Sequence, residues 1–83
     1  MYELSYSEKI LKQLKKIQVL DKNRIIKSLE RIRIRPHYFV KKIVGTKYFR
    51  LRVGNYRIIL NIINKNLVIY VLEFGHRKNI YKK

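Results

Sequence analysis

The sequence has no cysteine and is poor in acids, glycine and proline: its 83 residues include 5 Asp and Glu, 3 Gly and 1 Pro. Without cysteine, no disulfide can stabilise the fold and no thiolate can bind zinc. The two histidines are isolated and the acids are scattered, which is not a pattern of metal ligands. We therefore expect neither a metal ion nor a small-molecule cofactor.

Long apolar runs are also missing from the sequence. None approaches the roughly 18 residues that a membrane-spanning helix needs, and the N-terminus has no signal-like hydrophobic region. We therefore expect a cytoplasmic protein that makes no use of a membrane. Hydrophobic residues nevertheless make up 47% of the chain, which is enough to build a core, and the length fits a single domain over residues 1–83.

Positive charge dominates what the sequence does contain. It has 21 Lys and Arg, and the formal net charge is +16. Self-repulsion at this level weakens a compact state unless an anionic partner relieves it. A lysine-rich background that only aids solubility can account for lysines on helix surfaces, but not for arginines inside a strand pattern. We expect the partner to be nucleic acid, an acidic protein, or each of them in turn.

The first part of the chain predicts a short strand followed by a helix. Apolar and polar residues alternate over residues 2–6, which is typical of a half-buried strand. Ser7 can cap a helix over residues 8–20 by accepting a hydrogen bond from a free backbone N–H. The apolar residues of this helix recur at helical spacing and are expected to face the core: Ile10, Leu11, Leu14, Ile17 and Leu20.

A second helix is predicted over residues 22–34, with Asp21 as its cap. Its inward residues should be Ile25, Ile26, Leu29 and Ile32. Pro36 ends this helix, because the residue before a proline is driven out of the α region. The pattern then becomes extended and irregular over residues 37–45, with a short strand expected near Ile43.

Three strands are predicted in the second half, over residues 48–53, 56–63 and 67–74. Gly54 and Asn55 form a two-residue hairpin signal between the first two strands. The chain is expected to leave the sheet at Gly75. The predicted fold class is therefore α+β: a short N-terminal strand, a basic helical hairpin and a three-stranded antiparallel meander, forming one sheet packed on the helices.

The hairpin predicts that three arginines share one face of the sheet. A two-residue loop sets the register, so Arg52 should lie opposite Arg57, with Arg50 on the same face. Like charges directly across a ladder destabilise a sheet by up to about 1 kcal/mol. Guanidinium groups bind phosphate with two parallel hydrogen bonds and stay charged at any relevant pH. We therefore predict a phosphate-binding face, with a solvated face as the alternative.

The third meander strand is expected to add an apolar strip to the arginine face: Val68, Tyr70, Leu72 and Phe74. This strip is interpreted first as a surface for a partner protein. Its aromatic residues could instead stack on bases of single-stranded RNA. In a third interpretation, the C-terminal tail covers the strip.

The sequence shows no carboxylate pair, no nucleophile with an adjacent base and no glycine-rich phosphate loop. RNA, however, carries its own nucleophile, the 2′-hydroxyl beside each phosphodiester. An enzyme then needs only to orient this hydroxyl, stabilise the developing charge and move protons. Arginines can stabilise the charge, while His76 and Tyr81 are the candidates for proton transfer.

Two segments, YFRLRVGNYRIIL at residues 48–60 and EFGHRKNIY at residues 73–81, resemble the RelE/ParE toxin superfamily, in particular its RelE-like mRNA interferase branch. The resemblance spans essentially the whole chain. It implies the toxin of a type II toxin-antitoxin system, a metal-independent endoribonuclease that cleaves mRNA in the ribosomal A site by 2′-hydroxyl attack and so inhibits translation.

The same resemblance implies roles for individual residues. Arg57 and Arg77 would hold the scissile phosphate and stabilise its transition state. Arg50 and Arg52 would assist with positive charge and with proton relay, and Tyr81 would stack on the substrate or deprotonate it.

The resemblance also implies the partners: an acidic, RelB-like antitoxin, and the ribosome with its mRNA. Two alternatives stay open. One is a ParE-like gyrase inhibitor that cleaves no RNA, and the other is an RNA-binding module without catalytic activity.

Overall fold

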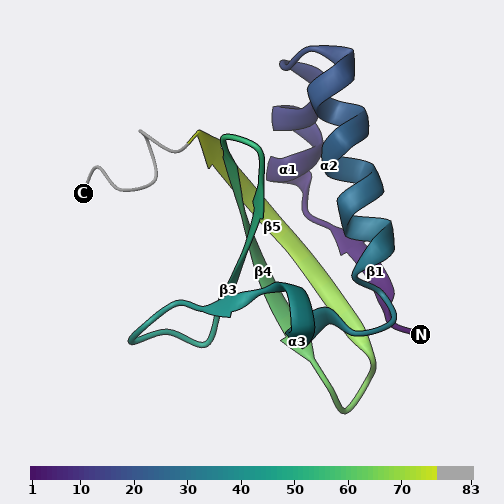
Figure 1. Ribbon diagram of the computed structural model, residues 1–83, viewed down its shortest axis with the longest axis vertical. Helices are drawn as coiled ribbons and strands as arrows, with labels where there is room; N and C mark the ends of the chain where they lie inside the picture. The colour runs from purple at the N-terminus through teal and green to yellow at the C-terminus, as the bar shows by residue number, and fades with distance from the viewer. Residues whose placement is uncertain (77–83) are drawn as a thin grey trace.

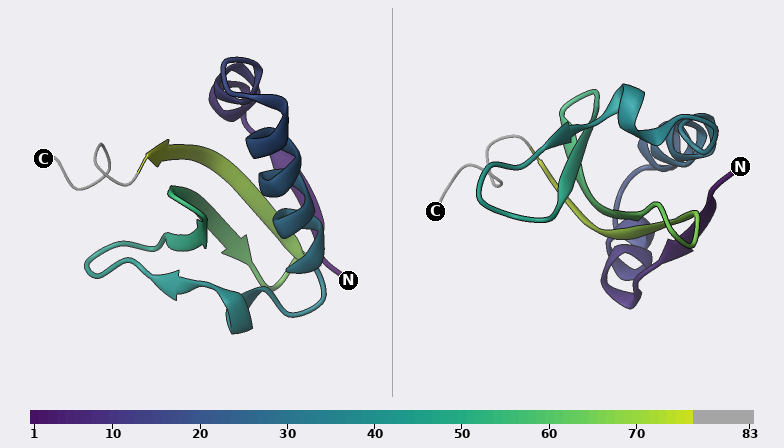
Figure 2. Two further views of the ribbon diagram at one scale, coloured as in Figure 1. Left: turned by 45° about the horizontal axis from the view of Figure 1, so that its top comes forward. Right: turned by 90° about the horizontal axis from the view of Figure 1, so that it is seen from below.

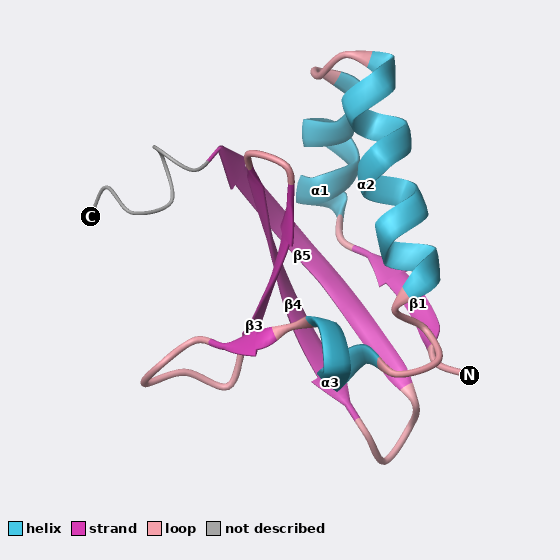
Figure 3. Cartoon of the chain, viewed as in Figure 1, coloured by secondary structure: helices cyan, strands magenta, loops and turns pink. Residues whose placement is uncertain are grey.

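The computed structural model describes residues 1–76 and shows one sheet with helices packed against it (Figure 1). Along the chain the elements are β1 (Glu3–Tyr6), α1 (Glu8–Lys15), α2 (Val19–Arg31), α3 (Pro36–Phe39), β2 (Lys41–Lys42), β3 (Phe49–Val53), β4 (Tyr56–Ile63) and β5 (Val68–His76). The sheet order is β1-β5-β4-β3-β2, as Figure 3 allows the reader to trace. β1 pairs with β5 in parallel, and all other pairs are antiparallel. The α+β prediction is confirmed.

The core is a single apolar cluster between the helices and one sheet face. It contains Ile10, Leu14, Ile25, Leu29, Ile32, Leu51, Val53, Ile58, Leu60, Ile62, Ile69, Val71 and Phe74. Helices α1 and α2 and strands β3 to β5 contribute to it, so burial of this cluster joins the two halves of the chain. Among the described residues, none of the helices combines the length and apolar character needed to cross a membrane.

The boundary between α1 and α2 differs from the prediction. Ser7 caps α1 as expected, and its hydroxyl oxygen accepts from the Ile10 N–H (3.1 Å). The first helix ends at Lys15 rather than residue 20, and α2 begins at Val19 after Gln18, so the predicted cap at Asp21 is wrong. The helical pattern continued across this turn because half-buried Ile17 still packs against the core there.

Two residues expected in the core are exposed. Leu20 falls in the first turn of α2 because of this boundary and is 78% exposed, and Leu11, within α1, is exposed as well. Asp21 instead lies in the first turn of α2, where the helix N-terminus favours a carboxylate.

Pro36 begins a new element rather than ending the second helix at residue 34 as predicted, because α2 already ends at Arg31. It occupies the first turn of α3, where its missing N–H costs nothing, and its ring is buried. The extended segment therefore starts later than predicted, and the short strand expected near Ile43 is β2 at Lys41–Lys42.

The β3–β4 hairpin agrees with the prediction at every pair. Val53 pairs with Tyr56 and Arg52 with Arg57, and the pattern continues along both strands. Gly54 has a φ of +58°, which an L side chain rarely adopts. A Cβ there would also lie 3.1 Å from Nη1 of Arg24 on α2, so the turn and the helix pack closely.

The β4–β5 pair contains an irregularity that the sequence analysis missed. Ile59 pairs with Glu73 but Leu60 pairs with Val71, so Leu72 is an extra residue on β5. Such a bulge bends its strand, and Figure 2 shows β5 curving along its length. After the bulge, each residue of β5 points to the opposite face from the one that strict alternation predicts. Phe74 is therefore only 8% exposed and packs in the core.

The predicted apolar strip is therefore shorter than expected. Phe74 is not part of it, whereas Tyr70 remains exposed and pairs with Asn61. Leu67, the first residue of the strand predicted over residues 67–74, instead lies in the turn before β5 with a φ of +55° and is exposed. β5 also continues past the predicted exit at Gly75 as far as His76.

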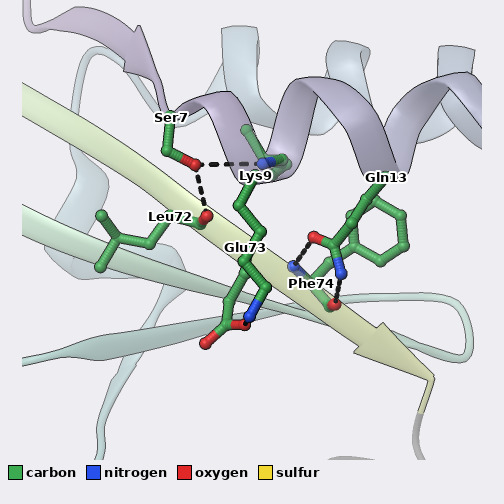
Figure 4. A network of polar contacts seen from close by, with 7 residues as sticks. Ser7, Lys9, Gln13, Leu72, Glu73 and Phe74 are labelled. Carbon is green, nitrogen blue, oxygen red and sulfur yellow. Dashed lines mark hydrogen bonds and ion pairs between the residues drawn. The ribbon is translucent and has the colours of Figure 1, made fainter.

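Along the second half of β5, side chains of α1 and of its cap Ser7 make the backbone hydrogen bonds that a neighbouring strand would make (Figure 4). The Gln13 side chain donates to the Phe74 carbonyl through Nε2 (2.7 Å) and accepts from the Phe74 N–H through Oε1 (2.9 Å). Ser7 Oγ donates to the Leu72 carbonyl (2.5 Å). Because β1 pairs only with residues 68–71, these contacts satisfy the strand edge where β1 has ended.

Candidate functional site

Three arginines lie on the sheet face opposite the core. Arg52 pairs directly with Arg57, and Arg50 pairs with Ile59, while the alternate residues Leu51 and Ile58 are buried on the core face. Alternation along both strands therefore brings the three guanidinium groups to one side of the sheet. This is the juxtaposition that the hairpin register predicts.

The arginines surround a pocket of about 140 Å³. Its lining residues are Phe39, Lys41, Arg50, Arg52 and Arg57, called the cationic pocket below. A water molecule occupies about 30 Å³ of liquid, so the pocket has room for a group of phosphate size. No carboxylate lines it within the described part of the chain.

Two lining residues were not found from the sequence, Lys41 and Phe39. Lys41 enters because β2 pairs with β3 and places it opposite Arg50. Phe39 is the last residue of α3, immediately before β2. The turn at Gly45, which has a φ of +79°, returns the chain into β3 and so sets this pairing.

The four cations differ in depth. Arg57 is only 5% exposed, Arg50 is half-buried, and Arg52 and Lys41 are exposed. A charge at the less solvated end of a pocket interacts with an anion more strongly than one surrounded by water. The pocket can therefore draw in an anion through its exposed cations and hold it most strongly near Arg57.

The structure places His76 away from the cationic pocket. It pairs with Tyr56 at the end of β5, and the two rings meet edge to face with centroids 5.8 Å apart. Gly75 is the residue opposite Arg57, so His76 belongs to the other face of the sheet. The part of His76 in proton transfer stays a prediction. The roles proposed for Arg77 and Tyr81 also stay predictions, because these residues lie outside the described part of the chain.

Tyr56 ties the hairpin to α2. Its hydroxyl donates to Asp21 Oδ2 (3.1 Å), and its ring meets Phe74 edge to face at 5.3 Å. Burial raises the pKa of the Tyr56 phenol, and the hydrogen bond to Asp21 and the negative charge of this carboxylate raise the pKa further. The residue next to Arg57 is thus held in its neutral form.

Acidic groups are few, and one of them is engaged by a lysine of α1. Glu73, the only acid in the second half of the chain, forms an ion pair with Lys9 Nζ (2.5 Å; Figure 4). Within residues 1–76, no three histidine or acidic side chains gather into a group that could hold a metal ion. The chemistry that the described site can perform is anion binding and stabilisation of negative charge.

The sequence matches the model of a known protein family. The family model for the ParE toxin of the type II toxin-antitoxin system, parDE, matches residues 4–81. No curated protein matches the sequence.

Solved structures resemble the chain over nearly its full length. The archaeal RelE-RelB complex from Pyrococcus horikoshii has a chain with 25% identity and a TM-score of 0.79, covering 92% of this chain and 94% of that one. For the RelB-RelE complex from Methanococcus jannaschii the values are 28%, 0.73, 94% and 95%. For the E. coli RelBE complex they are 21%, 0.78, 92% and 96%, a likeness of fold alone.

Proposed function

Since the chain belongs to the ParE toxin family, within the RelE/ParE superfamily of type II toxin-antitoxin toxins, we propose that it inhibits translation by cleaving mRNA on the ribosome. The observation that supports this most is the cationic pocket, in which four cations from three strands converge on a space of phosphate size. The fold of RelE chains in solved RelBE complexes supports the same proposal.

The proposed reaction uses the nucleophile that RNA contains. The 2′-hydroxyl oxygen attacks the adjacent phosphorus, and the bond from phosphorus to the 5′ oxygen of the next nucleotide breaks. The 2′-hydroxyl loses a proton and the leaving oxygen gains one. The products are a cyclic phosphate upstream and a 5′-hydroxyl downstream, so no other reactant is needed.

The cationic pocket is proposed to stabilise the transition state of this reaction. Negative charge builds up on the phosphate oxygens during attack, and fixed donors lower its energy without reorganising. One such donor contributes about 3–4 kcal/mol where water is excluded. Arg57 is the best placed to act in this way because it is the most buried of the four cations.

Proton transfer needs residues other than arginine. A guanidinium group does not release its proton at any relevant pH, so Arg50 and Arg52 can stabilise charge but cannot act as a base. The resemblance implies that Tyr81 stacks on the substrate or deprotonates it, and the chemistry of its imidazole makes His76 a second candidate for proton transfer. Arg77 is proposed to join Arg57 on the scissile phosphate.

An acidic antitoxin is the proposed protein partner. The similar chains from P. horikoshii and M. jannaschii were solved together with RelB. A net charge of +16 would steer an acidic partner to this chain quickly, and the association should weaken as salt rises. The ribosome as target places the proposed activity in the cytoplasm.

Gyrase inhibition is the second candidate, because the matching family model is that of ParE. In that case the arginine face would bind a protein and no RNA would be cut. The cationic pocket favours RNA, since a protein-binding face has no need for four converging cations around one small space.

The test is primer extension on mRNA from a purified translation reaction, with wild-type protein, an Arg50→Gln/Arg52→Gln variant and a Lys65→Gln control. Lys65 lies exposed in the β4–β5 turn. Cleavage at codon-spaced positions should need ribosomes, persist in the control and fall at least about a hundredfold in the variant. Intact mRNA at saturating protein, together with loss of supercoiling in a gyrase assay, would replace the proposal by gyrase inhibition.

A further inference from the structure

A second hollow lies beside the cationic pocket, where α2 ends and α3 begins. It has a volume of about 350 Å³. The residues around it are Arg31, Ile34, Arg35, Tyr38 and Phe39, called the aromatic groove below. None of these residues took part in the sequence-based prediction of a site.

The groove presents aromatic rings to solvent. Tyr38 is 78% exposed and Phe39 is 40% exposed, although both rings are large and apolar. Their planes are nearly perpendicular, with centroids 5.1 Å apart. Buried Pro36 anchors the start of α3, so the remaining residues of this single turn project outward. An exposed aromatic ring of this kind is a platform on which a nucleic-acid base can stack.

Two arginines give the groove a positive charge. Arg31 closes α2, Arg35 precedes α3, and both are exposed. The nearby acid Glu30 is engaged by Arg33, whose Nη1 lies 2.8 Å from Oε1. In residues 1–76 no carboxylate forms an ion pair with Arg31 or Arg35. The groove therefore matches a ligand that carries both a flat ring and negative charge.

The groove and the cationic pocket are neighbours that share one lining residue. Phe39 lines both of them, and Lys41 of the pocket follows Phe39 by two residues. A single RNA strand whose phosphate occupies the cationic pocket must leave it over adjoining surface. The aromatic groove offers such a surface, with charge that suits the phosphates and rings that suit the bases.

From this adjacency we propose that the aromatic groove binds the RNA beyond the two nucleotides that flank the scissile phosphate, with a base stacked on Tyr38 and phosphates on Arg31 and Arg35. The inference rests on the proposed function and extends it from one phosphate to a neighbouring stretch of the substrate. An acidic peptide could also use two arginines. RNA is favoured because the groove shares Phe39 with a pocket of phosphate size.

The test measures equilibrium binding of the full chain to two 2′-O-methyl oligonucleotides, which cannot undergo 2′-hydroxyl attack. A dinucleotide fills only the cationic pocket, and an octanucleotide also reaches the groove. Tyr38→Leu should weaken octanucleotide binding about five- to a hundredfold, while Tyr38→Phe keeps the ring and restores it. Neither change should alter dinucleotide binding.

Charge is tested by a matched pair of double variants. Arg31→Gln/Arg35→Gln should lower the salt dependence of octanucleotide binding by about one counterion per lost phosphate contact. Lys12→Gln/Lys16→Gln removes the same charge from exposed positions on and after α1 and should change this slope less.

The outcomes separate this inference from the proposed function. If Arg50→Gln/Arg52→Gln weakens dinucleotide binding but Tyr38→Leu leaves octanucleotide binding unchanged, only the groove proposal is overturned. If Arg50→Gln/Arg52→Gln leaves dinucleotide binding unchanged, the cationic pocket is not a phosphate site and both proposals are wrong. If Tyr38→Leu weakens binding of poly-glutamate but not of the octanucleotide, the groove belongs to an acidic protein and the RNA proposal is wrong.

Discussion

Individual residues of the cationic pocket work against the stability of the sheet that carries them. Arg52 and Arg57 face each other across the β3–β4 ladder, where like charges repel. Arg57 is also nearly buried, so its charge sits where water screens it poorly. Residues selected only for stability would not be arranged in this way, which is the pattern expected where function costs stability.

This conflict predicts opposite effects of one substitution. Arg52→Thr should raise the free energy of unfolding by up to about 1 kcal/mol, because it removes the cross-strand repulsion and threonine suits a strand. RNA cleavage should fall at least about tenfold with the lost charge. Thermal unfolding and primer extension measure the two effects, with Lys65→Thr as a control that changes neither. If the Arg52→Thr variant is less stable than wild type and fully active, Arg52 neither costs stability nor serves cleavage, and the prediction is wrong.

Tyr56 makes stability depend on pH at the alkaline end. Burial and the hydrogen bond to Asp21 raise its pKa in the folded state above the ordinary value of about 10. Above that value the unfolded chain loses this proton while the folded chain keeps it, so stability falls as pH rises through the folded pKa. Below pH of about 10 the full contribution is present.

Tyr56→Phe should therefore be less stable than wild type at neutral pH, by about 1 kcal/mol for the lost hydrogen bond. Its stability should also fall less steeply above pH of about 10. Some fall should remain, because burial raises the pKa of Tyr6 as well. Urea unfolding at a series of pH values measures both effects, and parallel curves for the two proteins would show that Tyr56 is not responsible.

At the scale of elements, the second half of β5 depends on α1 rather than on another strand. β1 has ended by Tyr6, and the Gln13 side chain then takes both hydrogen bonds of the Phe74 backbone. The same stretch of β5 carries Gly75 opposite Arg57. A helix side chain thus holds the strand that pairs with β4 next to Arg57.

Gln13→Ala should destabilise the protein by about 1–3 kcal/mol, because it leaves one donor and one acceptor of the backbone without their partner. Amide hydrogen exchange of residues 72–76 should accelerate more than that of β3. Gln18→Ala is the matched control, since Gln18 makes no side-chain cap hydrogen bond. Equal losses in the two variants would indicate a general effect of removing glutamine.

The elements also show what can be predicted from this sequence. The β3–β4 hairpin was predicted pair by pair because a two-residue loop allows only one register. The bulge at Leu72 was not, since an extra residue leaves the apolar pattern intact and only exchanges the faces beyond it. The α1–α2 boundary was missed because apolar residues keep helical spacing through the turn.

The candidate site divides in the same way. Arg50, Arg52 and Arg57 could be placed together because they lie on two strands with a known register. Phe39 and Lys41 could not, since the segment between Pro36 and β3 has no regular period and its pairing with β3 is a tertiary contact. Propensity and spacing report local structure, and such contacts are decided elsewhere in the fold.

The chain carries a net charge of +16, and the extents of the structure are only 33 × 27 × 22 Å. At about 0.01 M salt the Debye length is roughly 30 Å, so every cation repels every other across the molecule. At about 0.15 M it is roughly 8 Å, and only neighbours still interact. Self-repulsion should therefore be a main source of instability at low salt.

Melting temperature should accordingly rise between these two salt concentrations. Sodium sulfate should raise it more than sodium chloride of equal ionic strength if a divalent anion occupies the cationic pocket. The excess should be smaller in Arg50→Gln/Arg52→Gln than in wild type, which separates pocket binding from the general effect of sulfate. A melting temperature independent of salt would show that self-repulsion is unimportant.

The pairing of β1 with β5 has a consequence for how the protein is synthesised. Glu3 pairs with Val68, so the first strand made waits for the last described strand before it can enter the sheet. A nascent chain that stops before Val68 lacks β5, and so lacks both the strand that pairs with β1 and the Phe74 backbone that Gln13 binds. If the protein cleaves mRNA during translation, its own message is one of the substrates. The truncated polypeptides left by such cuts could not fold, and toxicity would belong only to chains whose translation had passed β5.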